Sequence, residues 1–339
     1  MGEPEGSRME TLVGNELCFP QFPNISCKRT FDHGGPAVFL YVTLTCISLL
    51  TVMLNLLVII SISHFRQLQN STNLLLLSLA VSDFFVGLLL LPGQMVMISG
   101  CWFLGTFICS AFYFASLSLT SASVGTMVLI SVDRYVAICD PLSYPTKVTE
   151  KRVKISVSLC WACSVFYNGV IMNVFLSDGD QFNTCYGDCV FLMGQITGVV
   201  DVAVTFVGPI AVIVVLYMKV FVVAVAQAQA MRSHITAVTV QGSGAVTAKK
   251  SERKAARILG IVVVVFVICF CPYFSASFIV SSFSVYVSFF GVLVLYFNSC
   301  INPIIYASFY PWFRRSIKLI VTLKILQHDS CDTHILQKC

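Results

Sequence analysis

Long apolar runs separated by short polar segments dominate the chain from residue 37 to residue 308. Each run exceeds the roughly 20 residues that an α-helix needs to cross a bilayer, whereas a transmembrane β-barrel would show alternating segments of about 10 residues. The pattern predicts an all-α membrane protein with a seven-transmembrane helix bundle. The expected spans are Ala37–Ile62, Asn73–Ile98, Thr106–Ile138, Val153–Leu176, Ile196–Val225, Ala256–Phe283 and Val285–Ser308.

Polar segments flank the predicted bundle on both sides. Residues 1–36 contain no apolar stretch long enough for a cleaved signal sequence, so we expect the first span to direct insertion. Residues 309–339 begin with Tyr310–Leu323, where apolar and basic residues are interspersed. That pattern predicts a short amphipathic helix on the inner leaflet. A cytosolic tail follows, in which Cys331 and Cys339 are either palmitoylated or free thiols.

Charged residues are scarce and unevenly placed. The chain of 339 residues is 57% hydrophobic and 11% charged, against about 25% charged in soluble domains. Of its 21 Lys and Arg residues, only Arg8, Lys28 and Arg29 precede the first span, and the loops after the second, fourth and sixth spans contain none. The positive-inside rule therefore predicts an N-terminus outside the plasma membrane and a cytosolic C-terminus. The net charge of +5 belongs to the cytosolic face and does not indicate nucleic-acid binding.

Six cysteines lie on the predicted outer side, where disulfides form. The preferred pairing joins Cys109 to Cys189, and Cys185 then pairs with Cys18 or Cys27, although sequence alone does not fix the connectivity. The six cysteines are Cys18, Cys27, Cys101, Cys109, Cys185 and Cys189.

Two further observations concern modification and catalysis. Asn24 begins an Asn-Ile-Ser sequon in the N-terminal tail, so it is a candidate glycosylation site. None of the five histidines lies in a span, and no nucleophile–base pair or metal-ligand spacing is present. The sequence therefore does not predict an enzyme.

Ionisable residues inside the predicted spans are few. Asp83 and Asp201 lie at depth, and Asp133 stands beside Arg134 at the inner end of the third span. Such residues are costly in a bilayer and indicate function. No Lys or Arg lies deep enough to neutralise Asp83 or Asp201, so each must join a hydrogen-bonded network, take up a proton or bind a cation.

Seven marks occur one in each span, in the order Asn55, Asp83, Asp133-Arg134-Tyr135, Trp161, Pro209, Pro272 and Asn302-Pro303-Ile304-Ile305-Tyr306. Together they resemble the rhodopsin-like G protein-coupled receptors across all seven spans. Asn298-Ser299, Tyr310 and Trp312-Phe313 around the last mark, together with the paired Cys185 and Cys189, are similar to the trace amine-associated receptors. Those receptors mostly serve as olfactory sensors of volatile amines.

The resemblance implies an activation switch at the inner end of the bundle. Arg134 would pair with Asp133 in the resting state, with Glu252 as a second partner, and the sixth span would pivot about Pro272. The alternative is that Asp133 and Arg134 only face lipid headgroups. Phe270 stands where these receptors usually have tryptophan. The other implied switch residues are Tyr135, Tyr217, Asn302, Pro303 and Tyr306.

An allosteric sodium pocket around Asp83 is also implied by the resemblance, and a structural water network is its alternative. No other cofactor is expected. The expected ligand set is Asp83, Ser123, Asn298, Ser299 and Asn302, with Asn55 close by.

The ligand site is expected to depart from most amine receptors. Ser116, eighteen residues before Arg134, occupies the position where those receptors have an aspartate. Asp201 lies eight residues before Pro209, about 12 Å along a helix toward the outer mouth. This resembles a subset of the trace amine-associated receptors, known mainly from fishes, with the carboxylate in the fifth span. The hypothesis is that Asp201 is the counterion of a protonated amine; the alternative is a protonated Asp201 bonded to Thr205 or to a carbonyl.

Aromatic and hydroxyl side chains are expected to complete the pocket. Asp188, in the loop after the fourth span, is a candidate for binding a second ammonium group, and its alternative is a solvated loop charge. The expected wall residues are Tyr113, Ser116, Thr120, Phe191, Thr205, Tyr273, Phe274 and Tyr296.

The resemblance implies a cell-surface olfactory receptor that binds protonated amines and raises cAMP through a heterotrimeric G protein with a stimulatory or olfactory α subunit. The main alternative is a rhodopsin-like receptor for a non-amine small ligand, because Ser116 removes the usual amine signature. A retinal-binding opsin would need a seventh-span lysine where the chain has Tyr296. A transporter or channel would show several pathway charges or an internal repeat, and neither is visible.

Overall fold

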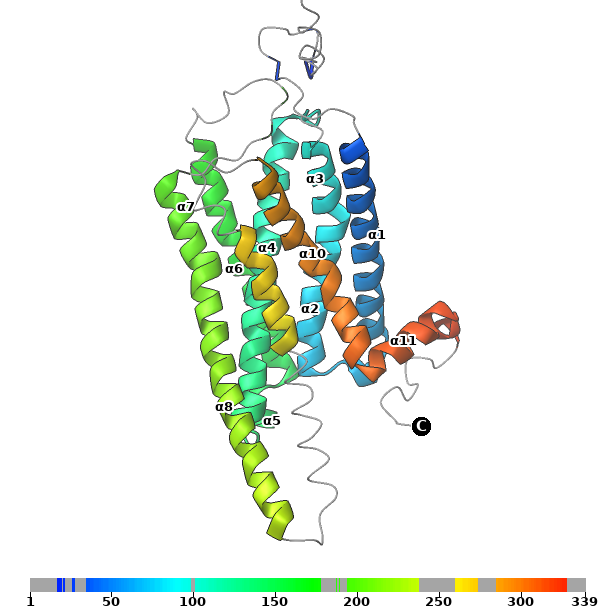
Figure 1. Ribbon diagram of the computed structural model, residues 1–339, viewed down its shortest axis with the longest axis vertical. Helices are drawn as coiled ribbons and strands as arrows, with labels where there is room; N and C mark the ends of the chain where they lie inside the picture. Colours follow the sequence, from blue (N-terminus) through cyan, green and yellow to red (C-terminus); the bar gives the residue numbers. More distant parts are fainter. Residues whose placement is uncertain are drawn as a thin grey trace, which may run out of the picture.

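The computed structural model describes residues 17–19, 21, 26–27, 35–98, 101–177, 187, 189, 194–237, 260–273 and 285–327. Over these ranges the chain forms an elongated bundle of roughly parallel helices (Figure 1). Six of the described helices are long and apolar enough to cross a membrane, and the shorter apolar helix Gly260–Tyr273 completes the seven-helix bundle.

The predicted spans and the observed helices agree to within a few residues, except that α8 runs past the predicted Val225 to Ala237 and that the sixth span is described only over Gly260–Tyr273. The first four spans are α1 (Gly35–His64), α2–η2–α3 (Ser71–Phe85, Val86–Leu90, Leu91–Ile98), α4 (Gly105–Cys139) and α6 (Glu150–Ser177). The fifth is α7–η3–α8 (Gln195–Val202, Ala203–Val207, Gly208–Ala237), and the seventh is α10 (Val285–Phe309). The short elements are η1 (Arg66–Leu68), α5 (Tyr144–Lys147), α11 (Pro311–Val321) and η4 (Lys324–Leu326).

Two spans contain a π-helical turn just before a proline. The η2 turn precedes Pro92 in α3, and the η3 turn precedes Gly208-Pro209 in α8. Proline lacks an N–H and its ring crowds the carbonyl four residues earlier, and one wider turn relieves both problems. The η3 turn begins at Ala203, two residues after Asp201.

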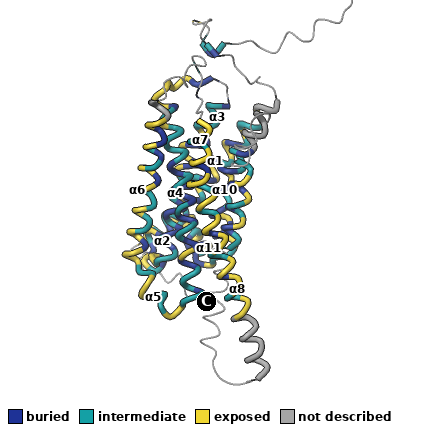
Figure 2. Tube along the Cα trace, turned by 90° about the vertical axis from the view of Figure 1, so that its left-hand side faces the viewer, coloured by how far each residue is buried: buried dark blue, intermediate teal, exposed yellow. Residues whose placement is uncertain are grey.

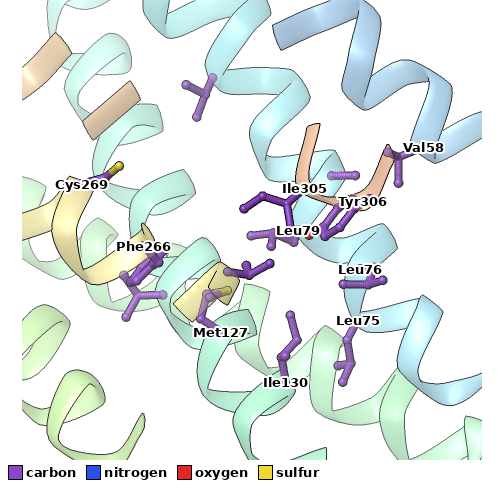
Figure 3. Packing of buried hydrophobic residues seen from close by; sticks show 14 of the residues in the cluster. Val58, Leu75, Leu76, Leu79, Met127, Ile130, Phe266, Cys269, Ile305 and Tyr306 are labelled. Carbon is purple, nitrogen blue, oxygen red and sulfur yellow. The ribbon is translucent and has the colours of Figure 1, made fainter. Parts of the chain in front are cut away.

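Buried apolar residues from five spans pack along the bundle axis (Figure 3). Side chains of α2 and α4 interleave with those of Gly260–Tyr273 and α10, and Tyr306 is the largest of the fully buried ones. The labelled members are Val58, Leu75, Leu76, Leu79, Met127, Ile130, Phe266, Cys269, Ile305 and Tyr306.

The outward faces of the bundle are apolar as well. Phe166 on α6 is 75% exposed and Phe221 on α8 is 65% exposed, and exposed residues run along α6 (Figure 2). A water-soluble protein does not leave such large contiguous apolar surfaces uncovered. These faces are therefore surrounded by lipid.

The predicted amphipathic helix is observed as α11, which runs across the ends of α1 and α10 (Figure 1). Its residues Trp312 and Phe313 are buried. The Arg314 guanidinium donates hydrogen bonds of 2.9 Å to the carbonyls of Ala307 and Ser308. These carbonyls end α10 without a helical partner, so Arg314 caps the seventh span and fixes α11 to it.

Two disulfides with both cysteines among the described residues join polypeptide segments at one end of the bundle, here termed the disulfide end. The Cys109–Cys189 bond is present as expected. Cys18 is bonded to Cys101, so the expected alternative of Cys18 with Cys185 was wrong. Cys18 and Phe19 pack against Gly187. The Trp102 amide donates to the Gly187 carbonyl at 2.8 Å, and this bond brings the preceding residue, Cys101, close to Cys18.

Cys27 is also disulfide-bonded, whereas Cys185 lies outside the described residues. Gly187 has a φ of +101°, and a Cβ there would lie 2.9 Å from the Phe19 ring. Glycine is therefore required where the N-terminal tail meets the loop before α7.

Candidate functional site

A network of hydrogen bonds holds Asp133 at the end of the bundle opposite the disulfides, here termed the Arg134 end. Arg134 Nε donates to Asp133 Oδ2 at 2.9 Å, and its Nη2 donates to the same oxygen and to Thr72 Oγ1. Thr72 donates to Asp133 at 3.1 Å, and Tyr144 of α5 donates to Asp133 Oδ1 at 2.8 Å. Both charges are buried. The alternative in which they face headgroups is therefore wrong for this conformation.

The inner tyrosines lie around this network. The Tyr217 and Tyr310 side chains are within electrostatic range of Arg134. The hydroxyls of Tyr217 and Tyr306 are buried and accept or donate no hydrogen bond among the described residues. Lys219 of α8 places its Nζ 5.8 Å from the centre of the Tyr135 ring, a cation–π distance.

Phe270 takes the position of the expected tryptophan in the Gly260–Tyr273 helix. Its ring stacks on Phe266 with centroids 3.9 Å apart, and both rings are buried. Gly291 of α10 lets this helix approach closely, because a Cβ there would lie 3.2 Å from the Tyr273 Cα. The stacked pair thus fills the core just below Pro272.

A cluster of buried amide and carboxyl oxygens surrounds Asp83 between α1, α2 and α10. Asn302 Nδ2 donates to Asp83 Oδ2 at 2.8 Å, and Ser299 lies beside the same carboxylate. Asn55 Nδ2 donates to the Ser299 carbonyl at 3.0 Å. Ser123 bonds Ser82 at 2.9 Å rather than Asp83 itself.

Several oxygens of this cluster accept no hydrogen bond from the described residues. They are Asn55 Oδ1, Asp83 Oδ1, Asn298 Oδ1 and Asn302 Oδ1. Oxygen donors of this kind suit a hard monovalent or divalent cation, so the residues present fit a sodium ion.

On the disulfide side of this cluster, α4 offers hydroxyls but no charge. Ser116 shares a hydrogen bond of 3.1 Å with the Tyr296 hydroxyl of α10. Tyr113 donates to the Cys189 carbonyl at 3.1 Å, so the Cys109–Cys189 bond and Tyr113 hold the same segment over the bundle. Thr120, a turn below Ser116, is half-buried.

Asp201 is the carboxylate at this level of the bundle, and it is only 6% exposed. Its Oδ1 accepts no hydrogen bond from any described residue. Thr205 donates at 2.7 Å to the Asp201 backbone carbonyl, so it does not serve the carboxyl group as the alternative proposed. The ion pairs of the described residues are Arg134–Asp133, Lys147–Asp140 and Lys154–Glu150, and none of them involves Asp201.

Two phenols approach the Asp201 carboxylate from other helices. Tyr167 of α6 and Tyr273 both lie within its electrostatic range. The Tyr167 hydroxyl is buried and within interaction range of the carboxylate. The site therefore combines one buried acid, two aromatic rings and no basic partner within the described part of the chain.

Several expected site residues lie outside the described residues. These are Asn24, Cys185, Asp188, Phe191, Glu252 and Phe274.

Comparison with known proteins decides the family. Residues 54–306 match the profile described as "7 transmembrane receptor (rhodopsin family)". Over 337 residues the chain is 37% identical to trace amine-associated receptor 13c of Danio rerio, covering 95% of this chain and 96% of that receptor. It is 37% identical over 335 residues to trace amine-associated receptor 7f of Mus musculus (95% and 93% covered). It is 35% identical over 346 residues to trace amine-associated receptor 6 of Pan troglodytes (98% and 99% covered).

The chain belongs to the trace amine-associated receptor family. Membership makes it a receptor and not an enzyme. It is a multi-pass plasma membrane protein with a small-molecule ligand and a heterotrimeric G protein as partners.

In this trace amine-associated receptor, sequence reasoning missed Tyr167. The residue lies in an apolar run of α6 whose hydroxyl-bearing positions carry no distinguishing spacing. The available signal was the Tyr167-Asn168 pair, two adjacent polar side chains inside a span. Polar groups at membrane depth rarely face lipid, and that rule points both residues toward the bundle.

Proposed function

We propose that this trace amine-associated receptor binds a protonated amine through Asp201 and activates a stimulatory or olfactory G protein, which raises cAMP. The single observation that carries the proposal is the Asp201 carboxylate, buried at 6% exposure with an oxygen that accepts no hydrogen bond within the described residues. A buried acid without a cation is held at a cost that a ligand ammonium group would recover.

The hydrogen bond between Ser116 and Tyr296 supports this assignment. Its hydroxyl is engaged with Tyr296 across the bundle, so α4 contributes a neutral, hydrogen-bonded wall. The ammonium group is then drawn toward α6 and α7, with Tyr273 providing an aromatic face. The rest of the ligand extends toward Ser116, Tyr113 and Tyr296, with Thr120 and Thr205 lining the base. Phe191, Phe274 and Asp188 complete the proposed pocket, and Asp188 would receive a second ammonium group.

The orientation of the receptor follows the charge distribution of the sequence. We place the disulfide end, with Asn24 as a glycosylation site, outside the cell, where disulfides form. The Arg134 end then faces the cytosol. In this proposal the hydrogen-bonded Asp133 and Arg134 represent the resting state, and agonist binding moves the Gly260–Tyr273 helix outward about Pro272. This movement would open the G protein site beside Tyr135, Tyr217, Glu252 and Tyr306.

A sodium ion is proposed as an allosteric ligand of the same receptor. Asp83, Asn298, Ser299 and Asn302 would hold it, with Ser123 at the edge of the cluster through Ser82. The bound ion would neutralise the Asp83 carboxylate, and the buried oxygens without hydrogen-bond donors support that assignment.

The test is a cAMP assay of Asp201→Asn against a panel of primary, tertiary and di-amines. Asn keeps the size of the side chain and removes the charge. Truncating one member of a buried ion pair costs about 3–5 kcal/mol, so amine potency should fall by at least ~100-fold at equal surface expression. Unchanged amine potency would reject Asp201 as the counterion. A native receptor that responds to none of the amines would favour the second candidate, a rhodopsin-like receptor for a non-amine ligand, for which the neutral Ser116–Tyr296 wall is the supporting observation.

A further inference from the structure

The ring of Phe112 on α4 lies directly against Gly93 of α3. A Cβ atom added to Gly93 would be 2.3 Å from Phe112 Cε2 and 2.6 Å from Phe112 Cδ2. Gly93 has a negative φ within its helix, so its backbone conformation is open to any L-residue. Glycine weakens a helix relative to alanine, and here it admits the Phe112 ring. We term the space beside the Gly93 Cα the Gly93 notch.

Two aromatic neighbours hold the Phe112 ring in the notch. The Trp102 ring lies with its centroid 6.1 Å from that of Phe112, and the Tyr113 ring meets it edge-on at 5.6 Å. Trp102 is itself fixed, because its indole N–H donates to the Gly105 carbonyl at 2.9 Å and its amide donates to the Gly187 carbonyl at 2.8 Å. The Phe112 ring therefore cannot leave the notch without disturbing buried neighbours.

Phe112 stands one helical turn from Ser116, on the disulfide side. Residues four apart lie on the same face of a helix, and a rise of 1.5 Å per residue separates them by about 6 Å along the axis. Ser116 faces α10, because it shares a hydrogen bond of 3.1 Å with Tyr296. The Phe112 ring and the Ser116–Tyr296 bond together fill the bundle between α3, α4 and α10, whereas Asp201 lies on α7.

We propose that Phe112 sets the size of the amine that the receptor accepts, because its ring fills the notch that a longer ligand would otherwise enter. With the ammonium group at Asp201, the organic part of the ligand extends across the bundle to the Ser116–Tyr296 bond and meets the Phe112 ring beyond it. The ligand class is therefore compact amines whose organic part ends at this ring. The inference rests on the proposed function, because Asp201 fixes the other end of the ligand.

The length of the ligand is the variable that reports on Phe112. Each buried CH₂ group raises affinity roughly fourfold, so the potency of n-alkylamines is expected to rise while added CH₂ groups find room. A chain that reaches the Phe112 ring must displace it or stay outside, and overfilling a packed site is unfavourable. The native receptor is therefore expected to show a potency maximum within the series and a fall of at least ~10-fold beyond it.

The experiment measures cAMP accumulation for n-alkylamines from butylamine to decylamine, at equal surface expression of the full-length receptor. Phe112→Ala removes the ring. Phe112→Leu keeps an apolar contact with the neighbouring rings and serves as the second variant if Phe112→Ala folds poorly. Phe107→Ala is the matched control, because Phe107 lies on the same helix and is 81% exposed. Asp201→Asn is measured in parallel.

In Phe112→Ala the potency maximum is expected at longer amines, and the longest amines gain at least ~10-fold, the effect of about two buried CH₂ groups. Phe112→Leu shifts the maximum in the same direction by less, and Phe107→Ala keeps the native profile. A maximum that stays at the same length in both Phe112 variants, or that moves equally in Phe107→Ala, overturns the inference. A native series without a maximum also overturns it.

Gly93→Ala tests the contact between the ring and the notch. The new Cβ collides with the ring, so Gly93→Ala should lower the thermal midpoint of the purified receptor when Phe112 is present. In the Phe112→Ala background the same change should cause no loss, because the ring is gone and alanine is the better helix former. An equal loss in both backgrounds would mean that the ring does not occupy the notch, which overturns the inference.

The two proposals fail in different ways. If Asp201→Asn keeps its amine potencies, the proposed function is wrong, and the inference falls with it because the ligand is no longer fixed at Asp201. If Asp201→Asn loses amines of every length while the maximum stays in place in the Phe112 variants, Asp201 remains the counterion and only the size-limiting role of Phe112 is rejected.

Discussion

Tyr144→Phe is expected to raise ligand-independent signalling. The Tyr144 hydroxyl donates to Asp133 Oδ1 at 2.8 Å and lies 3.4 Å from Thr72 Oγ1. Burial, together with the neighbouring Asp133 carboxylate, raises the pKa of the Tyr144 phenol above its usual value. The phenol therefore stays protonated at physiological pH and remains a donor. Phenylalanine keeps the aromatic ring and removes only the hydroxyl, with its contacts to Asp133 and Thr72.

The size of the effect follows from the bonds that Asp133 retains. A hydrogen bond to a charged group contributes roughly 1.5–3 kcal/mol. Because Arg134 and Thr72 still donate to Asp133 in the variant, the lower value of about 1.5 kcal/mol applies, which is about a tenfold shift of the resting–active equilibrium. A resting receptor that is about 1% active would become about 10% active.

The assay is basal cAMP in the absence of any amine, normalised to surface receptor. Lys147→Ala is the matched control on the same short helix, since its ion pair with Asp140 is solvent-exposed and holds nothing buried. That pair contributes about 0–1 kcal/mol and does not involve Asp133 or Arg134, so basal cAMP should stay close to the native level. Basal cAMP that is unchanged in Tyr144→Phe, or equally raised in Lys147→Ala, would refute a restraining role for this bond.

Two other predictions concern the sodium cluster and the tail disulfide. Replacing NaCl by choline chloride should raise amine potency at least about fivefold in the native receptor and leave Asp83→Asn unaffected; a sodium effect that persists in Asp83→Asn would reject the site. Cys18→Ser, Cys101→Ser and the double variant should each lower the free energy of unfolding of the purified receptor by the same amount, roughly 2–5 kcal/mol, measured as a shift in thermal midpoint. Additive losses would contradict the observed pairing.

The helices could be predicted because membrane spans depend on length and apolarity alone. Over the described residues the helices lie where the apolar runs place them, and α8 extends past the predicted Val225 into the following segment. The π-helical turns at η2 and η3 could not be foreseen in position, since proline permits a kink, a bulge or a break and packing selects among them.

The candidate site was predictable only where charge marks it. Asp83, Asp133, Arg134 and Asp201 stand out because ionisable residues are rare in spans, and the structure buries all four. Tyr167 did not stand out, because a tyrosine in an apolar run gives no sign of which neighbour its hydroxyl meets. The Cys18–Cys101 bond likewise depends on how the tail crosses Gly187, which no spacing of cysteines encodes.

The most direct test of Asp201 as counterion is a thermodynamic cycle between the charge of the ligand and the charge of the receptor. Binding to purified receptor is measured for an amine and for its neutral alcohol analogue, each with the native protein and with Asp201→Asn. A direct buried ion pair predicts a coupling energy of at least about 1.5 kcal/mol, because the amine loses far more affinity than the alcohol. A coupling energy indistinguishable from zero, with both ligands weakened alike, would contradict the account.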